Sequence, residues 1–338
     1  MPRGRRRWVS QEWGAFHIVS HTVENTPLFS DQEKKYFFQL MRRLSQGFFI
    51  KIHTYCIMGN HFHILATGME LDAKHASKED LIRRYKAIYG KYSEYPAGAH
   101  DGNIGSIIPD EDGGIERLRE RLGSISRFVQ ELKQNFTRWY NKKHNRKGYL
   151  WRERFKGVIV YHGMGELVCS AYIDLNPLRA GIVKLPEDYK WSSLSLRIKA
   201  PRLTEKFLYP ITYPDSMDNC VEGKDNDDWT WIDIPLFPLN KDMREVEWYR
   251  QYVYAAGGIP VPGKAQIPER MLTEVLYLNK DLGTLNRLCF GVRNISYGIA
   301  IGGYETIENL QRDLKRKVIN ARSFINSHYI RATRVLRL

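Results

Sequence analysis

The sequence predicts an α+β protein with a ferredoxin-like sandwich, in which helices cover an antiparallel sheet, followed by a mainly helical C-terminal region. Short runs of β-branched and aromatic residues are separated by amphipathic segments in the order strand, helix, strand, strand, helix, strand. The second half instead shows helical periodicity over 240–256, 268–279 and 305–326. These two patterns set the expected architecture.

The first elements carry local boundary signals. Residues 15–20 are predicted to form a strand, and Ser30 and Glu33 form a capping box before a helix that we expect to run through about Leu44. Residues 158–161 are predicted as a later strand of the same sheet.

A hairpin that carries two histidines is expected next. Residues 50–58 favour a strand, and Gly59-Asn60 supplies a turn, so His61 and His63 fall on the second strand. Strand side chains alternate, so both imidazoles point to one face and can reach one metal ion. The spacing leaves open the alternative that they are ordinary hydrogen-bonded groups.

A helix over 165–175 is predicted to carry a phenol and an amide on one face. Tyr172 and Asn176 stand at i and i+4, and Pro177 should place Asn176 at or just past the helix end. Its carbonyl oxygen would then be available to bind a ligand. Tyr172 as a core residue and Asn176 as a turn or cap residue remain open alternatives.

These residues resemble the motifs of the single-tyrosine HUH transposases, and more closely their REP-associated tyrosine transposase branch. Four motifs occur in the order of that branch between about residues 8 and 198. They are His61-Phe62-His63; Asn141 followed by Gly148-Tyr149-Leu150-Trp151 and Arg154-Phe155-Lys156; the block from Tyr172 to Gly181; and Trp191-Ser192-Ser193.

The resemblance implies an HUH nuclease fold and a role for each matched residue. It implies that His61 and His63 bind a divalent metal ion, Mg²⁺ or Mn²⁺, that Asn176 is the third protein ligand, and that Tyr172 is the nucleophile. Imidazole ligands would also accept Zn²⁺. Tyr140 is a rival nucleophile, for which we favour a packing or stacking role. The sequence spacing does not require that the metal also lies near His17, His21, His53 or His162.

The charge distribution indicates a polyanionic partner. The net charge is +14, and residues 201–338 hold 19 Lys and Arg against 17 Asp and Glu, so the first 200 residues carry +12. In the densest basic stretch, 133–156, cations are interleaved with aromatic residues, which suits single-stranded DNA, although a solvated helix face remains an alternative. The candidate DNA-binding residues are Arg138, Lys142, Lys143, Arg146, Lys147, Trp151, Arg152, Arg154 and Lys156.

Other classes are disfavoured. No apolar run approaches the roughly 18 residues that span a bilayer, and the N-terminal residues lack a signal-peptide pattern, so we expect a cytoplasmic protein with no membrane partner. The four cysteines are widely spaced, which predicts neither a zinc ribbon nor a disulfide framework.

We expect three regions along the chain. Residues 1–200 form the single-tyrosine HUH transposase domain, with an insertion at about 68–114 that contains a charged helix over 78–89. Residues 201–238 form a linker, and residues 239–338 form a helical C-terminal domain that is a candidate DNA-binding region.

The predicted function is that of a transposase: a metal-dependent single-stranded DNA endonuclease and strand transferase that acts at hairpin-forming or palindromic DNA through a 5′-phosphotyrosine intermediate. One alternative is a regulatory or domesticated protein that binds DNA hairpins without cutting them. Another is a metal hydrolase that uses a bound water. The oligomeric state, monomer or homodimer, is left open.

Overall fold

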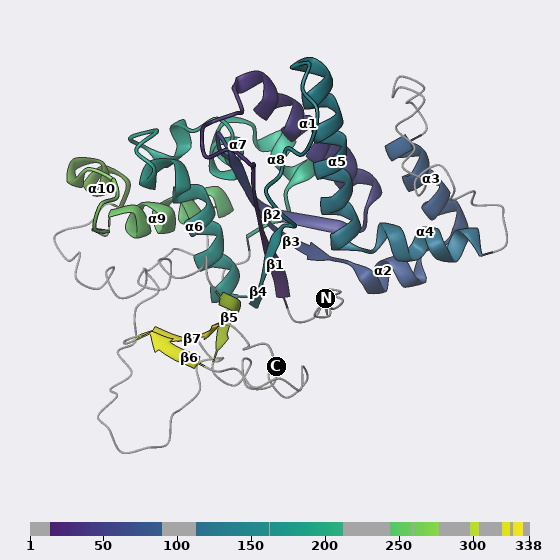
Figure 1. Cartoon of the computed structure of the whole chain (residues 1–338). Helices are drawn as coiled ribbons and strands as arrows, with labels where there is room; N and C mark the ends of the chain where they lie inside the picture. Colours follow the sequence, from purple (N-terminus) through teal and green to yellow (C-terminus); the bar gives the residue numbers. More distant parts are fainter. Residues whose placement is uncertain are drawn as a thin grey trace.

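The protein combines helices with a sheet whose first four strands in sequence, β1 to β4, pair antiparallel (Figure 1). A computed structural model describes residues 14–89, 113–161, 163–211, 244–258, 260–276, 298–303, 320–324 and 327–333. The strands lie in the order β2-β3-β1-β4, and each pairs antiparallel with its neighbour. Their bounds are β1 Gly14–His21, β2 Ile50–Ile57, β3 His61–Gly68 and β4 Lys156–Tyr161. The predicted strands and hairpin are therefore present.

Helices lie on both faces of this sheet. On one face, α1 (Asp31–Gly47) and α5 (Ile125–Lys143) pack together, and the ring of Phe37 on α1 contacts Phe62 on β3 at 4.9 Å. On the other face lies α6 (Met164–Arg179), whose Tyr172 contacts histidine rings of the sheet. The alternation of side chains along each strand thus separates an aromatic face from a histidine face.

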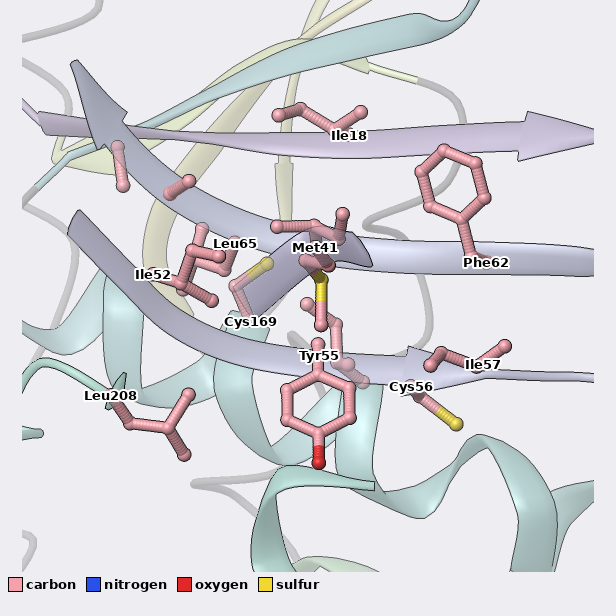
Figure 2. Packing of buried hydrophobic residues seen from close by; sticks show 14 of the residues in the cluster. Ile18, Met41, Ile52, Tyr55, Cys56, Ile57, Phe62, Leu65, Cys169 and Leu208 are labelled. Carbon is pink, nitrogen blue, oxygen red and sulfur yellow. The ribbon is translucent and has the colours of Figure 1, made fainter. Parts of the chain in front are cut away.

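The hydrophobic core lies mainly between the sheet and its helices. Figure 2 shows Ile18 and Phe62 on neighbouring strands, with Met41 and Tyr55 nearby, and all four side chains are buried. Burying a side chain of this size contributes about 1.5–3 kcal/mol. This packing fixes the strands from which the opposite face presents its polar groups.

The predicted capping box is confirmed and extends into an ion-pair cluster. The Ser30 side chain accepts from the backbone N–H of Gln32, and the Glu33 carboxylate accepts from the Ser30 backbone N–H at 2.9 Å. Glu33 also pairs with Lys143 and His144 at the C-terminal end of α5. Burial alone would raise the pKa of Glu33, but hydrogen bonds from Lys143, Ser30 and His144 outweigh it and lower the pKa to about 2.

Replacing Glu33 by Gln should destabilise the protein at neutral pH by about 2–3 kcal/mol, because charge-assisted hydrogen bonds to a buried carboxylate are lost. The pKa of Glu33 is lower in the folded than in the unfolded chain, so its contribution is present above pH 4.5 and disappears as the pH falls toward 2. Urea unfolding at pH 7 and pH 3 would measure this. Glu205→Gln, at an exposed position of α8 (Pro201–Phe207), is the control. An equal deficit for Glu33→Gln at both pH values would contradict the assignment.

Helix α6 corrects one sequence expectation. It continues to Arg179, so Pro177 lies inside the helix and Asn176 does not lie past its end. Pro177 removes one backbone donor and disfavours helical geometry for the residue before it, but it stands in the last turn, where little of the helix remains to be disrupted. The helix then ends with Ala180 N–H donating to the Asn176 carbonyl and Gly181 adopting a φ of 70°.

A buried carboxylate holds α6 against the helices that follow it. Asp174 is fully buried, and burial raises its pKa to about 6. Its oxygens accept hydrogen bonds of 2.7–3.0 Å from the Ser193 hydroxyl, the Leu194 backbone N–H and the Tyr249 hydroxyl. These donors come from α7 (Ser193–Lys199) and α9 (Glu245–Gly258). The turn of α6 that carries Tyr172 is thereby fixed.

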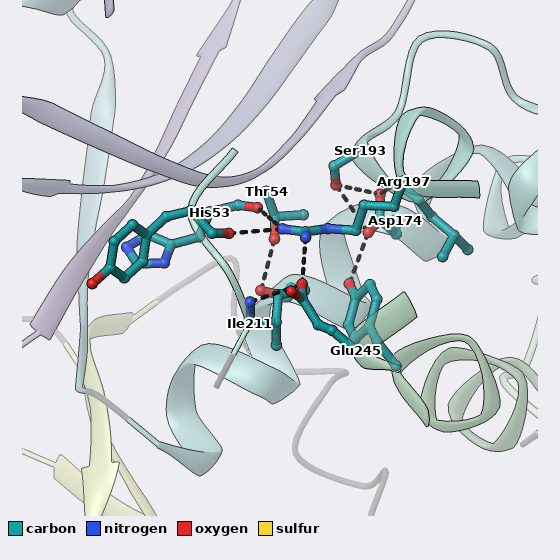
Figure 3. Close-up of polar contacts among 11 residues, drawn as sticks. His53, Thr54, Asp174, Ser193, Arg197, Ile211 and Glu245 are labelled. Carbon is teal, nitrogen blue, oxygen red and sulfur yellow. Dashed lines mark hydrogen bonds and ion pairs between the residues drawn. The ribbon is translucent and has the colours of Figure 1, made fainter. Parts of the chain in front are cut away.

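Arg197 extends this polar cluster to the sheet, as Figure 3 shows. Its guanidinium donates to the backbone carbonyls of His53 (2.8 Å) and Tyr209 (2.9 Å), and it pairs with Glu245 at the start of α9. Trp248, Tyr249 and their neighbours in α9 belong to the same hydrophobic core as the sheet. α9 therefore packs directly on the first part of the chain, and the predicted division into domains stays a prediction.

The described part of the predicted insertion contains two helices, and a third begins where the insertion ends. They are α2 (Glu70–His75), α3 (Lys78–Tyr89) and α4 (Gly114–Leu122). The charged helix predicted over 78–89 is confirmed. Residues 90–112 of the predicted insertion lie outside the described residues.

The C-terminal region is less helical than predicted. The 3-10 helix η1 (Pro186–Asp188) and helix α8 (Pro201–Phe207) precede this region. The helices predicted over 240–256 and 268–279 are present as α9 and α10 (Glu269–Leu276). The prediction of a helix over 305–326 is wrong at its C-terminal end, because β6 lies there. Residues 304–319 lie outside the described residues. The described strands β5 (Gly298–Gly303), β6 (Asn320–Phe324) and β7 (Ser327–Thr333) extend the sheet from β4.

The start of the predicted linker is also partly ordered into regular structure. α8 occupies 201–207, and Leu208 then forms a parallel bridge with Ile52 of β2. The rest of that linker, 212–238, lies outside the described residues. No helix in the described ranges is both long and apolar enough to cross a membrane.

Candidate active site

In the described part of the chain, four histidines gather on the sheet face that α6 covers. His17 and His21 come from β1, and His61 and His63 come from β3. The strand register pairs His21 with His61, and their rings stack with centroids 4.7 Å apart. The rings of His61 and His63 meet edge to face at 5.1 Å. The two imidazoles of β3 thus share one face, as their spacing predicts.

The cluster runs from the interior to the surface. His17 and His63 are buried, with His17 Nε2 lying 2.9 Å from His63 Nδ1, whereas His61 is half-buried and His21 is exposed. Burial lowers the pKa of His17 to about 3 and that of His61 to about 4, and it lowers the pKa of His63 well below its usual value. These imidazoles are therefore neutral at pH 7, which is the form that binds metal ions.

His63 offers a nitrogen that suits a cation. Its Nε2 is buried, and no hydrogen-bond partner is found for it among the described residues. An unpaired buried polar atom costs about 1–3 kcal/mol, so it marks a place where a ligand can be held. The neutral imidazole nitrogens of His61 and His63 therefore suit a divalent cation. The described residues contain no group of three His, Cys, Asp or Glu side chains arranged for a metal, so a further ligand would need another chemistry, such as an amide.

Tyr172 of α6 lies against the two buried histidines. Its ring centroid is 5.8 Å from that of His17 and 5.8 Å from that of His63, and both contacts are edge to face. The side chain is half-buried and packs at the border of the core instead of inside it. A phenol from α6 and the histidine pair of β3, more than 100 residues apart in sequence, thus meet at one place.

Asn176 lies one turn after Tyr172 on α6. Its side-chain nitrogen donates to the Tyr172 carbonyl at 2.9 Å, which directs the amide along the helix. The amide is half-buried, and the acceptor oxygen is the atom left to meet a cation. Its role as the third ligand stays a prediction.

Sequence reasoning did not require His17 and His21 at this site. Their signal was partly present, because residues 17 and 19 share one face of the predicted first strand, and residue 21 shares it when the strand continues to His21, as β1 does. That this strand lies next to β3 depends on the strand order, which the local sequence does not specify. His53 lies elsewhere, 2.8 Å from the Thr67 hydroxyl and 3.7 Å from Glu166, and His162 is outside the described residues.

The rival nucleophile Tyr140 lies on the other side of the sheet. It is buried on α5, where its ring packs against Phe29, Phe136 and His144. Its hydroxyl donates to the Leu28 carbonyl at 3.5 Å, and burial raises its pKa. The packing role that we favoured for Tyr140 agrees with this position.

The predicted DNA-binding cations occupy the end of α5 and the segment that leads to β4. The exposed ones are Lys142, Lys143, Lys147, Arg152, Arg154 and Lys156, and Arg138 and Arg146 are half-buried. Lys143 pairs with Glu33, and Arg146 pairs with Glu24 at 2.8 Å. A phosphate would have to compete with these carboxylates. Their DNA-binding roles stay predictions.

This basic surface, residues 142–156, reaches the histidine cluster. Lys156 is the cross-strand partner of Val19, so its side chain shares the face on which His17 and His21 lie. The Arg152 backbone N–H donates to the His21 carbonyl at 3.0 Å. After burial, the charges of Lys156 and Arg152 are the next causes that lower the pKa of His21. Positive charge therefore continues from α5 to the edge of the candidate site.

Two aromatic residues of this surface, Trp151 and Tyr149, differ in how far their rings are exposed. Trp151 is half-buried, its Nε1 donates to the Lys133 carbonyl at 3.2 Å, and its ring contacts Phe29 and Phe62 of the core. Its DNA-binding role stays a prediction. Tyr149 is instead 87% exposed. Its loop is held on both sides, by Asn141 donating to the Gly148 carbonyl and by Val23 donating to the Leu150 carbonyl.

Comparison with known proteins finds a likeness in structure and no match in sequence. No protein-family model matches the sequence, and no curated protein matches it. A solved structure described as the "Structure of the REP associates tyrosine transposase bound to a REP hairpin" is similar with a TM-score of 0.38 and 14% sequence identity. The similarity covers 64% of this chain and 93% of that chain. At this TM-score we base nothing on the likeness, and membership of that family stays a prediction.

Proposed function

We propose that the protein is a transposase of the single-tyrosine HUH type, a metal-dependent endonuclease and strand transferase that acts on single-stranded DNA at hairpin-forming or palindromic sites. One observation carries the proposal: the Tyr172 ring lies against His63, whose buried Nε2 has no hydrogen-bond partner among the described residues, next to His61 and at the end of a basic surface. The proposal includes a ferredoxin-like sandwich, which the strand order β2-β3-β1-β4 supports.

In the proposed reaction the Tyr172 oxygen attacks a phosphorus of the DNA backbone. A bond from phosphorus to the phenolic oxygen forms while the bond to the 3′ oxygen breaks. The phenol gives up its proton and the leaving 3′ oxygen takes one up, so the step has no net change in protons. The products are a 5′-phosphotyrosine link and a free 3′-hydroxyl. Attack by a 3′-hydroxyl on that link reverses the step and rejoins DNA, so one site can both cut and transfer a strand.

The chain's residues have separate tasks in this step. A phenol has a pKa near 10 and is a weak nucleophile at pH 7, so its oxygen must be held in line with the phosphate. Helix α6, fixed through Asp174, holds the Tyr172 ring. His61 and His63, with Asn176, would bind Mg²⁺ or Mn²⁺, and that ion would polarise the phosphate and stabilise its developing charge.

Tyr149 is expected to act as a stacking platform for an unpaired base. Tyr149→Ala should weaken binding of a hairpin with a single-stranded flank by about 5- to 150-fold, which corresponds to about 1–3 kcal/mol per stacked base. Tyr149→Phe should bind as the unchanged protein does, because it keeps the ring. Fluorescence anisotropy at fixed salt would measure the dissociation constants.

Tyr209 is the control for this measurement. It is 40% exposed and lies beside Lys51 on the edge strand β2, away from the Tyr149 loop. Tyr209→Ala should therefore leave DNA affinity unchanged. A Tyr149→Ala protein that binds as tightly as Tyr149→Phe would remove the stacking role.

The proposed function is tested by a search for the covalent intermediate. The protein is incubated with Mn²⁺ and single-stranded hairpin DNA labelled at its 3′ end, and the products are separated on a denaturing gel. We expect the label to migrate with the protein, and EDTA to prevent this. Binding without cleavage would favour the hairpin-binding regulatory alternative, to which the same basic surface is suited. Cleavage with no protein-linked label would favour a hydrolase.

A further inference from the structure

The side chain of Asn60 links the candidate site to a neighbouring loop. Asn60 stands in the turn between β2 and β3, directly before His61. Its Nδ2 donates to the backbone carbonyl of Asn25 at 2.7 Å, and its Oδ1 lies 2.7 Å from Nδ1 of His61. One carboxamide therefore contacts both a backbone group and a candidate metal ligand.

These two contacts determine where the proton of His61 lies. A backbone carbonyl can only accept, so the NH₂ end of Asn60 must face Asn25 and the oxygen must face His61. An amide oxygen also only accepts, so Nδ1 of His61 must carry the proton. A neutral imidazole has one N–H, so with the proton on Nδ1 its Nε2 carries a lone pair.

The backbone of this turn is held without the Asn60 side chain. The Thr22 backbone N–H donates to the Asn60 carbonyl at 2.8 Å, and the Thr22 hydroxyl donates to the same oxygen at 3.1 Å. The Asn25 side chain is held separately by Arg152. Loss of the Asn60 carboxamide should therefore change the His61 ring and leave the hairpin folded.

We propose that Asn60 is a positioning residue: it fixes the Nδ1–H tautomer and the ring orientation of His61, so that Nε2 is presented to a divalent cation. A hydrogen bond from the second ring nitrogen to an acceptor is how histidine ligands are oriented in metal sites. The cation part rests on the proposed function. The tautomer part stands on the hydrogen bonds themselves.

The tautomer is measured by ¹⁵N NMR of histidine-labelled protein at pH 7 without metal, with His61→Gln used to assign the His61 signals. We expect Nδ1 of His61 to be protonated in the unchanged protein and in Asn60→Asp, which keeps an acceptor at this position. Asn60→Ala should lose this preference. Asn25→Ala is the matched control, because it leaves the backbone carbonyl in place and should not change the tautomer.

Metal affinity provides a second readout, with Mn²⁺ and Co²⁺ titrated by calorimetry. Asn60→Ala should bind each ion about 10- to 100-fold more weakly, while Asn25→Ala should bind as the unchanged protein does. An unchanged tautomer in Asn60→Ala, or a proton on Nε2 of His61 in the unchanged protein, overturns the inference. If the unchanged protein binds neither ion, the proposed function and the cation role fail, while the NMR result still decides the tautomer.

Discussion

Tyr172→Phe should abolish the covalent protein–DNA adduct and slow DNA cleavage by at least about 10³-fold. Phenylalanine keeps the ring that packs against His17 and His63, so α6 should stay in place, but it lacks the oxygen that attacks phosphorus. Loss of a nucleophile removes an interaction with the reacting atom itself, and such changes cost several orders of magnitude in rate. The rate of adduct formation with 3′-labelled hairpin DNA measures the effect.

Two comparisons make this result specific. The dissociation constant for DNA should change by less than about threefold in Tyr172→Phe, so that the defect lies in the chemical step. Tyr140→Phe should form the adduct at the unchanged rate, because Tyr140 lies on the opposite face of the sheet. An adduct that forms normally in Tyr172→Phe would assign the nucleophile to another residue.

His63→Leu should weaken Mn²⁺ binding by at least about 100-fold and reduce cleavage in parallel. The substitution removes the buried Nε2 that has no partner among the described residues and replaces the ring with an apolar side chain of similar reach. Removing an unsatisfied buried polar atom is often nearly neutral for stability, although His17 loses its contact with Nδ1. We therefore expect a large loss of metal affinity with a small change in melting temperature.

Isothermal titration with Mn²⁺ and thermal unfolding of the same samples separate these effects. His75→Ala, at an exposed position near the end of α2, is the control and should change neither quantity. Full metal affinity in His63→Leu would show that the ion, if bound, sits elsewhere. Loss of the folded state in that variant would instead place His63 in a structural role, in which case His61→Ala at the half-buried position would give the affinity test.

Local signals in the sequence were sufficient for much of the central fold. The capping box at Ser30 and Glu33 and the hairpin at Gly59-Asn60 specify element boundaries within a few residues, and α1, β2 and β3 begin where they indicate. Pro177 was misleading because a proline in a last turn costs only one hydrogen bond, which tertiary contacts of α6 offset.

The C-terminal strands could not be predicted in the same way. β5 pairs in parallel with β4, about 140 residues earlier, and β6 and β7 are placed through β5. Such pairing is non-local, so helical periodicity in a single window does not report it. The predicted helix over 305–326 failed at β6 for this reason.

The site shows the same division between local and non-local information. The shared face of His61 and His63 follows from strand alternation, and Tyr172 was identified through the motif resemblance. The approach of His17 and the exposure of Tyr149 instead depend on which strand and which loop lie alongside. Composition located the basic stretch but did not distinguish the half-buried ring of Trp151 from the exposed ring of Tyr149.

The central claim is that His61 and His63 of β3 bind one divalent cation next to the phenol of Tyr172 on α6. Anomalous diffraction from crystals soaked in Mn²⁺ tests it most directly. We predict a single strong peak about 2.0–2.3 Å from Nε2 of both His61 and His63, on the side that faces Tyr172. A peak that touches neither nitrogen, or ordered Mn²⁺ found only at other residues of the protein, would contradict the account.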